Sequence, residues 1–257
     1  MPSIYTPENT KPAYELNWGL TVFWRAAPVP DTQWLTALQQ ATEPDGVRVL
    51  KHRLTTGDAS QFFVSTKPHV KPEALLRSVK GRLQHAIREQ VPKAFQRNYG
   101  LRGIGAAKRS AVEQYVADQL GHHRMADPNV QQRLARFQKS YPDVDLSLPS
   151  FSAHGEYWYN LHVVFVSAER WMEIRERVLE ERLNAIEATA GTCGHRLSRA
   201  AILPDHVHVT LGCGISESPE QVALGYMNAC AEAAGSKPEW RFSYYTGTIG
   251  EYDRGAV

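Results

Sequence analysis

The sequence contains few cysteines, and their number and spacing exclude a disulfide-built scaffold. Only three occur among 257 residues, namely Cys193, Cys213 and Cys230. An odd number at these separations fits neither a disulfide framework nor a familiar metal-ligand spacing. We therefore expect a protein of a reducing compartment, the cytoplasm, whose stability comes from a hydrophobic core.

The sequence also lacks the segments that mark a membrane protein or a nucleotide-binding loop. No apolar run is long enough to span a bilayer, and the N-terminal residues are polar and include proline, unlike a signal peptide. No glycine-rich loop of the Walker type is present. These absences predict a protein without a membrane partner.

A large net charge is absent too, but charge is unevenly divided along the chain. The formal net charge is +2, yet residues 67–109 hold eleven Lys and Arg against two acids, and residues 215–257 hold three against six. A basic surface attracts nucleic acid, and the interleaved Phe95 and Tyr99 suit stacking of unpaired bases. A solvated helical face that happens to be basic is the alternative. The residues that we expect to contact nucleic acid are Arg77, Lys80, Arg82, Arg88, Lys93 and Arg97.

The two halves of the chain follow the same plan. An apolar, aromatic run at residues 18–24 has a counterpart at 159–165, and a Pro-Glu helix start at 72–73 has one at 219–220. An Ile-Gly pair follows these features in each half, at 104–105 and at 249–250. The identity is low, so the repeat rests on order and spacing, and chance similarity is the alternative. An internal repeat of this kind predicts two units of one fold.

The strongest candidate for a functional site is a pair of histidines on one predicted strand. His206 and His208 lie in an apolar run with Val207 between them, a pattern that is typical of a β-strand. Positions i and i+2 of a strand point to one face, so both imidazoles can reach one divalent metal ion. Two histidines on an ordinary strand are the alternative. Counting from the two Pro-Glu helix starts, the first half has Ala59 and Gln61 at these positions.

A second candidate lies on a helix that only the first half contains. Residues 108–120 include good helix formers and an apolar spacing of Val112, Val116 and Leu120. Tyr115 and Gln119 are four residues apart and therefore lie on one helix face. A surface tyrosine beside a solvated glutamine is the alternative. The second half ends where its own version of this helix would begin.

These features together resemble the single-tyrosine HUH transposases of insertion sequences. The resemblance covers nearly all of residues 15–257, is specific at the histidine and tyrosine motifs, and departs from the family because two copies are fused in one chain. The residues that carry it are Pro204-Asp205-His206-Val207-His208, Ser218-Pro219-Glu220, the Ile-Gly pairs, and Tyr115 with Gln119.

The resemblance implies a composite site for DNA cleavage and rejoining. His206, His208 and Gln119 would bind one divalent ion, Mg²⁺ or Mn²⁺, and Tyr115 would attack single-stranded DNA to form a 5′-phosphotyrosine intermediate. In that family the tyrosine helix of one subunit serves the histidines of the other, so this chain would be a monomeric pseudo-dimer, with further dimerisation possible. The DNA is expected to have hairpin ends. A domesticated nickase or ligase, and a non-catalytic regulator that binds DNA hairpins, are the alternatives.

The predicted fold class is α+β, as two tandem ferredoxin-like or RRM-like units whose sheets join edge to edge. We expect a first copy at 14–125, a connector at 126–150 and a second copy at 151–257, preceded by a loose tail at 1–14. The expected strands of the first copy are near 20–25, 47–54, 60–66 and 101–104, and its helices near 32–41, 72–90 and 108–120. The second copy would repeat this order with a long helix at 169–190, and the connector would begin with a polar helix to about residue 140.

The remaining histidines carry no assigned function in the sequence. His122 and His123 follow Gly121 and are interpreted as exposed residues at a helix end, and His162 as structural because it lies in an apolar strand. No partner pattern is recognisable for the others, which are His52, His69, His85, His154 and His195.

Overall fold

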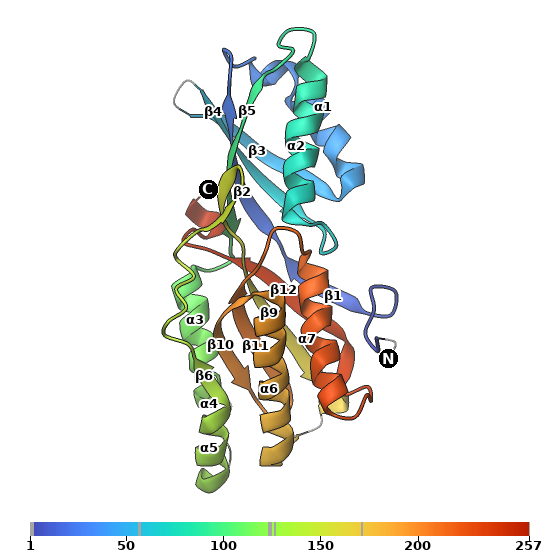
Figure 1. Cartoon of the computed structure of the whole chain (residues 1–257), viewed down its shortest axis with the longest axis vertical. Coiled ribbons are helices and arrows are strands. Elements are labelled where there is room, and N and C mark those ends of the chain that lie inside the picture. The colour runs from blue at the N-terminus through green and yellow to red at the C-terminus, as the bar shows by residue number, and fades with distance from the viewer. Residues whose placement is uncertain (1–2, 56–57, 123–124, 126, 171, 257) are drawn as a thin grey trace.

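The computed structural model describes residues 3–55, 58–122, 125, 127–170 and 172–256, which form an α+β protein. These residues contain seven α-helices and twelve strands, and the strands form two six-stranded mixed sheets. Figure 1 shows the two sheets one above the other along the long axis of the molecule. The α+β class predicted from the sequence is confirmed.

The upper sheet in Figure 1, called sheet B, comes mainly from the first half of the chain. Its strand order is β3-β4-β2-β5-β8-β7. The helices α1 (Leu35–Thr42) and α2 (Pro72–Ile87) cover one face, because alternate residues of β2 such as Trp18 and Leu20 are fully buried. The strands are β2 (Asn17–Trp24), β3 (Val47–Leu54), β4 (Ala59–Thr66), β5 (Phe95–Ile104), β7 (Ser150–Ser152) and β8 (Gly155–Trp158).

The lower sheet, called sheet A, comes mainly from the second half and has the order β1-β12-β9-β11-β10-β6. The helices α6 (Glu176–Cys193) and α7 (Pro219–Ala233) cover one of its faces (Figure 1). A capping box between Ser218 and Gln221 starts α7. The strands are β1 (Lys11–Glu15), β6 (Gln138–Ser140), β9 (Asn160–Ser167), β10 (Arg196–Ile202), β11 (His206–Gly212) and β12 (Trp240–Ile249).

Four strands of each sheet have the same order and register. In sheet B the order is β5-β2-β4-β3, and in sheet A it is β12-β9-β11-β10. Asn17 at the start of β2 lies opposite Ile104, and Asn160 at the start of β9 lies opposite Ile249. These matching registers allow the two halves to be compared residue by residue.

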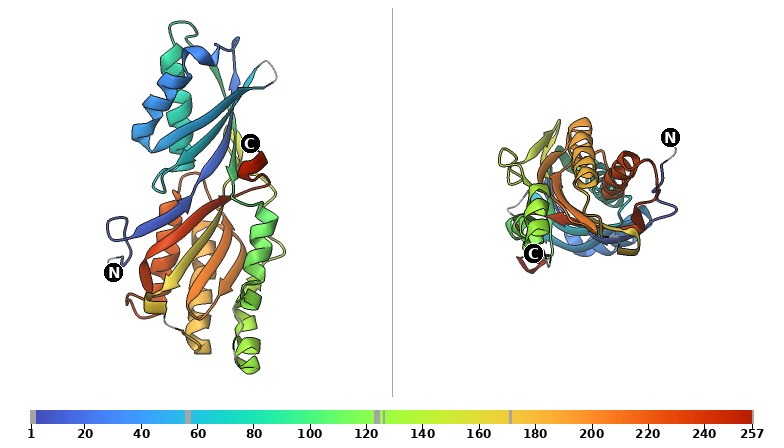
Figure 2. Two further views of the ribbon diagram at one scale, coloured as in Figure 1. Left: turned by 180° about the vertical axis from the view of Figure 1, so that it is seen from behind. Right: turned by 90° about the horizontal axis from the view of Figure 1, so that it is seen from below.

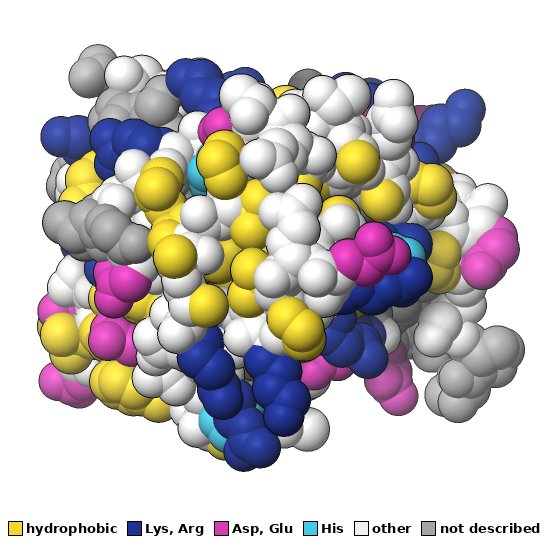
Figure 3. Space-filling model, turned by 90° about the horizontal axis from the view of Figure 1, so that it is seen from above, with side chains coloured by type: hydrophobic (Ala, Val, Ile, Leu, Met, Phe, Trp, Pro, Cys, Tyr) yellow, Lys and Arg dark blue, Asp and Glu magenta, His cyan; other side chains and the backbone are white. Residues whose placement is uncertain are grey.

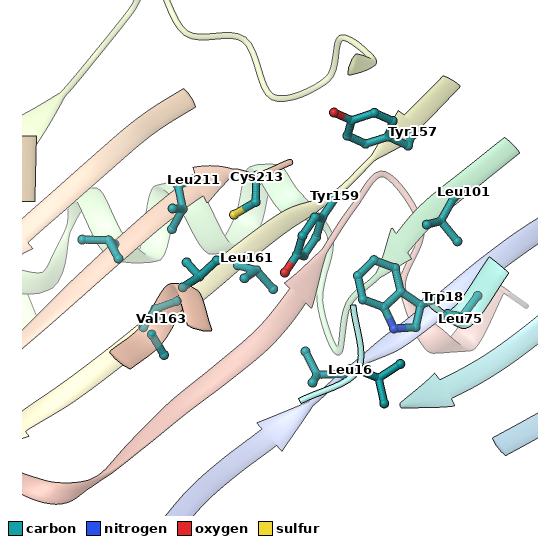
Figure 4. Close-up of a cluster of buried hydrophobic side chains, with 14 of the residues drawn as sticks. Leu16, Trp18, Leu75, Leu101, Tyr157, Tyr159, Leu161, Val163, Leu211 and Cys213 are labelled. Carbon is teal, nitrogen blue, oxygen red and sulfur yellow. The ribbon is translucent and has the colours of Figure 1, made fainter. Parts of the chain in front are cut away.

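Each half adds one strand to the sheet of the other. β1 pairs in parallel with β12, and β8 pairs in parallel with β5. Only Leu16 separates β1 from β2, and only Tyr159 separates β8 from β9, so the chain passes directly from one sheet to the other. The Trp18 and Tyr159 rings meet there, with centroids 5.3 Å apart (Figure 4). One continuous hydrophobic core therefore runs through both halves.

The N-terminal segment differs from the prediction of a loose tail. The Tyr5 side chain is buried, and its hydroxyl oxygen accepts hydrogen bonds from the amides of Glu239 and Trp240 at 2.9 and 2.6 Å. Residues 11–15 form β1. The prediction was wrong because the partners of this segment, including residues 243–247, lie more than 200 positions away in the sequence.

Several predicted boundaries also change. Residues 138–140 of the connector form β6 and pair with β10, so the polar helix ends earlier, at Leu134 of α5 (Pro128–Leu134). The long helix begins at Glu176 and not at residue 169, because Glu169 has φ 53° and Arg175 directly before the helix is extended, with φ −70° and ψ 116°. The last strand of the first half is longer than expected, since β5 begins at Phe95.

The tyrosine helix lies against sheet A, away from the other helices of the first half. α3 (Arg109–Ala117) and α4 (Gln119–His122) are followed by α5 along one side of the lower sheet (Figures 1 and 2). Val112 and Val116 of α3 pack on Ala201 and Leu203 at the end of β10. Among the described residues, no helix is both long and apolar enough to cross a membrane.

Candidate active site

The two histidines of the predicted motif lie on β11 in the centre of sheet A. β11 pairs on both sides, with β9 and β10, and every residue of it is buried. Val207 and Val209 point into the core, so His206 and His208 point to the opposite face. Each histidine is 5% exposed, and their ring centroids are 5.0 Å apart. A central strand thus holds both imidazoles rigidly on one surface.

α3 places Tyr115 of the first half beside this surface of the second half. The centroids of the Tyr115 and His208 rings are 5.7 Å apart, in a T-shaped arrangement. The Tyr115 side chain remains 46% exposed, so a large substrate can reach it. Tyr115 and the histidine pair were predicted to meet from different halves, and the structure places the Tyr115 ring beside that of His208.

Gln119 is fully buried near the end of the tyrosine helix. Its Nε2 donates a hydrogen bond to the Tyr115 carbonyl oxygen at 3.1 Å. Its Oε1 is buried and has no hydrogen-bond partner among the described residues. Tyr115 and Gln119 were expected on one continuous helix, but Asp118, with φ −93° and ψ 7°, ends α3 between them. A buried acceptor without a partner costs about 1–3 kcal/mol.

A third imidazole, not predicted as functional, completes the arrangement. His162 of β9 has its Nε2 2.9 Å from Nδ1 of His208, and the two rings are stacked. Burial lowers the pKa of His162 to about 4, so this side chain is neutral at pH 7. His162 therefore contacts His208 directly, whereas the sequence had indicated a structural role. The sequence carried no signal for this contact, because it depends on the pairing of β9 with β11.

The Nδ1 atoms of both motif histidines are engaged by neighbouring groups. Nδ1 of His206 lies 2.6 Å from Oδ1 of Asp205, to which it can donate, and Nδ1 of His208 faces His162. A neutral imidazole with its proton on Nδ1 has its lone pair on Nε2. Partners of this kind commonly orient metal-bound histidines. Two such imidazoles and the Oε1 of Gln119 fit the donor set of a divalent cation.

A buried polar network holds the tyrosine helix on sheet A. Glu113 of α3 is 7% exposed, pairs with Arg109 and accepts a hydrogen bond from the Ser198 hydroxyl of β10 at 2.6 Å. The Ser198 hydroxyl also lies 2.8 Å from that of Thr210 on β11. Arg109 extends the network to Glu251 near the C-terminus, with Nε 2.9 Å from Oε1. These bonds fix α3 relative to the strand that carries the histidines.

His122 and His123 were expected to be exposed residues at a helix end. His122 is exposed, but its ring centroid is 5.7 Å from that of Tyr115, closer to the candidate site than its sequence position indicated. His123 lies outside the described residues. No further role follows for His122 from its geometry.

The corresponding face of sheet B contains different chemistry. Gln61 lies opposite Thr21, which is four residues after Asn17. His208 lies opposite Val164, which is four residues after Asn160, so Gln61 and His208 occupy matching positions. Ala59 likewise matches the position of His206, as the sequence spacing predicted. Seen from behind in Figure 2, no helix of the described residues covers this face. The first half therefore has neither the ligands nor the tyrosine helix at its own equivalent site.

The predicted nucleic-acid contacts divide into two groups. Lys80 donates to the Gln96 and Arg97 carbonyl oxygens at 2.9 and 3.2 Å, and Arg82 forms an ion pair with Asp45 at 2.8 Å. Lys80 is half-buried, whereas Arg82 remains exposed despite its ion pair. The others are exposed too, and Figure 3 shows groups of Lys and Arg side chains at this end of the molecule. This second group consists of Arg77, Arg88, Lys93 and Arg97.

Comparisons with known proteins do not assign the chain to a family. No protein family matches the sequence, and no curated protein matches it. The chain is similar to an unknown protein from Galdieria sulphuraria with a crystal structure, at 10% identity over 91% of this chain and 97% of that one. The TM-score of that pair is 0.22, so it supports no conclusion about fold or function.

Proposed function

We propose that this chain cleaves and rejoins single-stranded DNA by the chemistry of the single-tyrosine HUH transposases. The observation that carries the proposal is the position of Tyr115, whose ring lies 5.7 Å from that of His208 although the two come from different halves of the chain. A tyrosine and a histidine pair arranged in this way suit attack on a phosphodiester. A hydrolase that activates water has no need of a tyrosine in this place.

Tyr115 is the proposed nucleophile. Its hydroxyl oxygen forms the new bond to phosphorus, the 3′ oxygen of the preceding nucleotide leaves, and a 5′-phosphotyrosine bond remains. A tyrosine with a free pKa of about 10 is a weak nucleophile, so placement is decisive. The network through Glu113 and Ser198 supplies that placement. Rejoining is the reverse attack by the 3′ hydroxyl of a second DNA end, which needs no external energy source.

His206, His208 and Gln119 are the proposed ligands for Mg²⁺ or Mn²⁺. When bound, such an ion polarises the scissile phosphate and stabilises its developing negative charge. Asp205 and His162 hold the two imidazoles so that Nε2 is the ligand atom, and Gln119 offers its Oε1. Imidazole and amide ligands add no negative charge, so an anionic phosphate can approach them.

The proposed architecture is a fused pair of ferredoxin-like units. The order β5-β2-β4-β3 and its counterpart β12-β9-β11-β10 both follow the pattern fourth-first-third-second within a β-α-β-β-α-β unit. The reciprocal additions of β1 and β8 relate the halves as two subunits of a symmetric dimer would be related. Such a pseudo-dimer has a composite site that combines Tyr115 of the first half with the histidines of the second half.

Single-stranded DNA, with or without hairpin ends, is the proposed partner, and the first half offers it two surfaces. The helix side includes a groove of about 610 Å³ lined by Arg77, Tyr99 and His154. The open face of sheet B exposes Arg53 and Arg102. Cations beside aromatic rings suit an unpaired strand, because every base has a face that can stack.

The test is a covalent-adduct assay with labelled single-stranded oligonucleotides and Mg²⁺ or Mn²⁺. The wild-type chain should retain a 5′-phosphorylated DNA fragment through denaturing electrophoresis, and Tyr115→Phe should bind DNA without forming this adduct. Tyr252→Phe, at another exposed tyrosine, is the matched control. Adduct formation by Tyr115→Phe would contradict the assignment, and DNA binding without any adduct in the wild type would favour a non-catalytic regulator.

A further inference from the structure

A cluster of metal-ligating side chains lies on the helix side of sheet A, apart from the candidate active site. The ligand atoms of Cys193, His195 and Glu217 all lie within 4.8 Å of one another. They come from the end of α6, the residue before β10 and the loop before α7. The sequence spacing had not indicated this site, because Glu217 follows His195 only after two intervening strands.

The backbone brings Cys193 and His195 to the same side of a tight reversal. Gly194 between them has φ 68°, a left-handed conformation that ends α6. The His195 amide donates to the Ala190 carbonyl oxygen at 2.8 Å and closes the turn. Cys193 is exposed and its thiol is free, so an ion from solution can reach the cluster.

The other two groups are held by α7. Tyr226 of α7 is buried, stacks on the His195 ring and has its hydroxyl 3.0 Å from Nδ1. Nε2 of His195 faces Oε2 of Glu217 at 2.9 Å. Glu217 directly precedes Ser218, which caps α7, so its backbone is fixed. The imidazole is therefore oriented by a hydroxyl on one nitrogen and presents the other nitrogen to the carboxylate and the thiol.

We propose that Cys193, His195 and Glu217 form a binding site for Zn²⁺. A thiolate, an imidazole and a carboxylate are ligands that Zn²⁺ accepts together, whereas Mg²⁺ and Mn²⁺ prefer oxygen ligands. With bonds of about 2.0–2.3 Å to one ion, the ligand atoms need to move only a short distance from their present separations. The Cys193 thiol releases its proton to solvent on binding, and water fills the fourth position. The Tyr226 hydroxyl can accept a hydrogen bond from the Nδ1–H group and so keep Nε2 as the ligand atom.

In the second half, the Zn²⁺ site would connect the reversal before β10 to the start of α7. In the first half, the equivalent reversal is connected to α2 by an ion pair and a hydrogen bond. At the equivalent reversal before β3, Gly46 has φ 74° and the preceding Asp45 pairs with Arg82 and Ser78 of α2. The second half has Cys193 in place of Asp45. The loop that carries Glu217 also contacts the first half, since the Ile215 carbonyl oxygen accepts from the Glu73 amide at 3.2 Å. Zn²⁺ at this place would therefore stabilise α6, α7 and the contact between the halves.

The experiment is a titration of the metal-free full-length chain with CoCl₂ followed by ZnCl₂. One equivalent of Co²⁺ should produce a thiolate-to-metal charge-transfer band in the near ultraviolet, and Zn²⁺ should displace it. The histidines of β11 cannot produce this band, because no thiolate lies among their proposed partners. The result is therefore independent of the proposed DNA chemistry.

Cys193→Ser, at an exposed position, should fold normally and lose the band. Tyr226→Phe should weaken Zn²⁺ binding about 10- to 100-fold, the usual effect of removing the partner of a metal-bound histidine. Glu232→Gln, at an exposed glutamate of α7, is the control and should bind like the wild type. Absence of the band in the wild type, or its persistence in Cys193→Ser, would overturn the proposal.

Discussion

The two halves of this chain share four strands of matching order and register. They differ in the sheet face that points away from α1 and α2 in the first half and away from α6 and α7 in the second. On sheet A this face carries His206 and His208 and is covered by α3. On sheet B the same positions hold Ala59 and Gln61, and the face is open. The difference shows that one backbone arrangement supports either a face covered by a helix or an open face. Side chains at a few register positions, together with one added helix, decide between them.

The largest expected difference between the halves is between His208 and Gln61, which occupy the same register position. His208→Ala should slow metal-dependent DNA cleavage by on the order of 10³-fold, because it removes a group that acts only with the intact site. Gln61→Ala should change the rate less than about twofold, since a surface substitution has little effect. Single-turnover cleavage of an oligonucleotide measures both. Similar reductions of the cleavage rate in the two variants would contradict the assignment of the metal site to the second half alone.

A second difference is the anchoring of α3, which sheet B lacks. Glu113→Ala removes the buried partner of Arg109 and Ser198 and should lower the free energy of unfolding by about 3 kcal/mol. Gln114→Ala, next to it on the exposed side, should change this free energy by less than about 0.5 kcal/mol. Urea denaturation followed by circular dichroism gives both values. If the two variants unfold alike, the network does not hold the helix.

The third comparison concerns His162, whose counterpart in the first half is Gly19. His162→Ala should weaken Mn²⁺ binding about 10- to 100-fold, because His208 loses the group that orients its ring. His154→Ala, at an exposed histidine, should have no effect. Nitrogen NMR of the imidazoles should also show the His208 proton leaving Nδ1 in the His162 variant. If the Mn²⁺ affinity and the His208 tautomer are both unchanged in this variant, His162 has only a structural role.

The smallest expected effect distinguishes the two basic surfaces of the first half. Removing one side chain that neutralises a phosphate of single-stranded DNA should reduce the slope of log K against log salt by about 0.7. The double variant Arg53→Ala/Arg102→Ala tests the open face of sheet B, and Arg77→Ala/Arg88→Ala tests the helix side. Fluorescence anisotropy over a salt series measures both slopes. The pair with the smaller slope identifies the surface that holds DNA, and unchanged slopes in both would exclude the first half as the DNA-binding surface.

Much of the fold could be predicted from the sequence because its signals are local. The alternation in residues 17–24 and the helix starts at Pro72 and Pro219 correspond to elements close to their predicted positions. The errors lie where partners are distant. β1 exists only because β12 accepts it as an edge strand, and β6 only because β10 does. Short segments of this kind have no periodicity of their own.

The arrangement of the candidate site also depends partly on local spacing in the sequence and partly on contacts between distant segments. The two-residue spacing of His206 and His208 determined that they share a face, since side chains alternate along any strand. The spacing of Tyr115 and Gln119 predicted one turn of a continuous helix, but Asp118 ends α3 between them. Tertiary structure alone decided that Tyr115 and His162 lie beside His208, and that Cys193, His195 and Glu217 converge. The physical reason is that local sequence determines which side chains share a face of one strand or helix. Strand pairing and helix packing then bring together groups that are far apart along the chain.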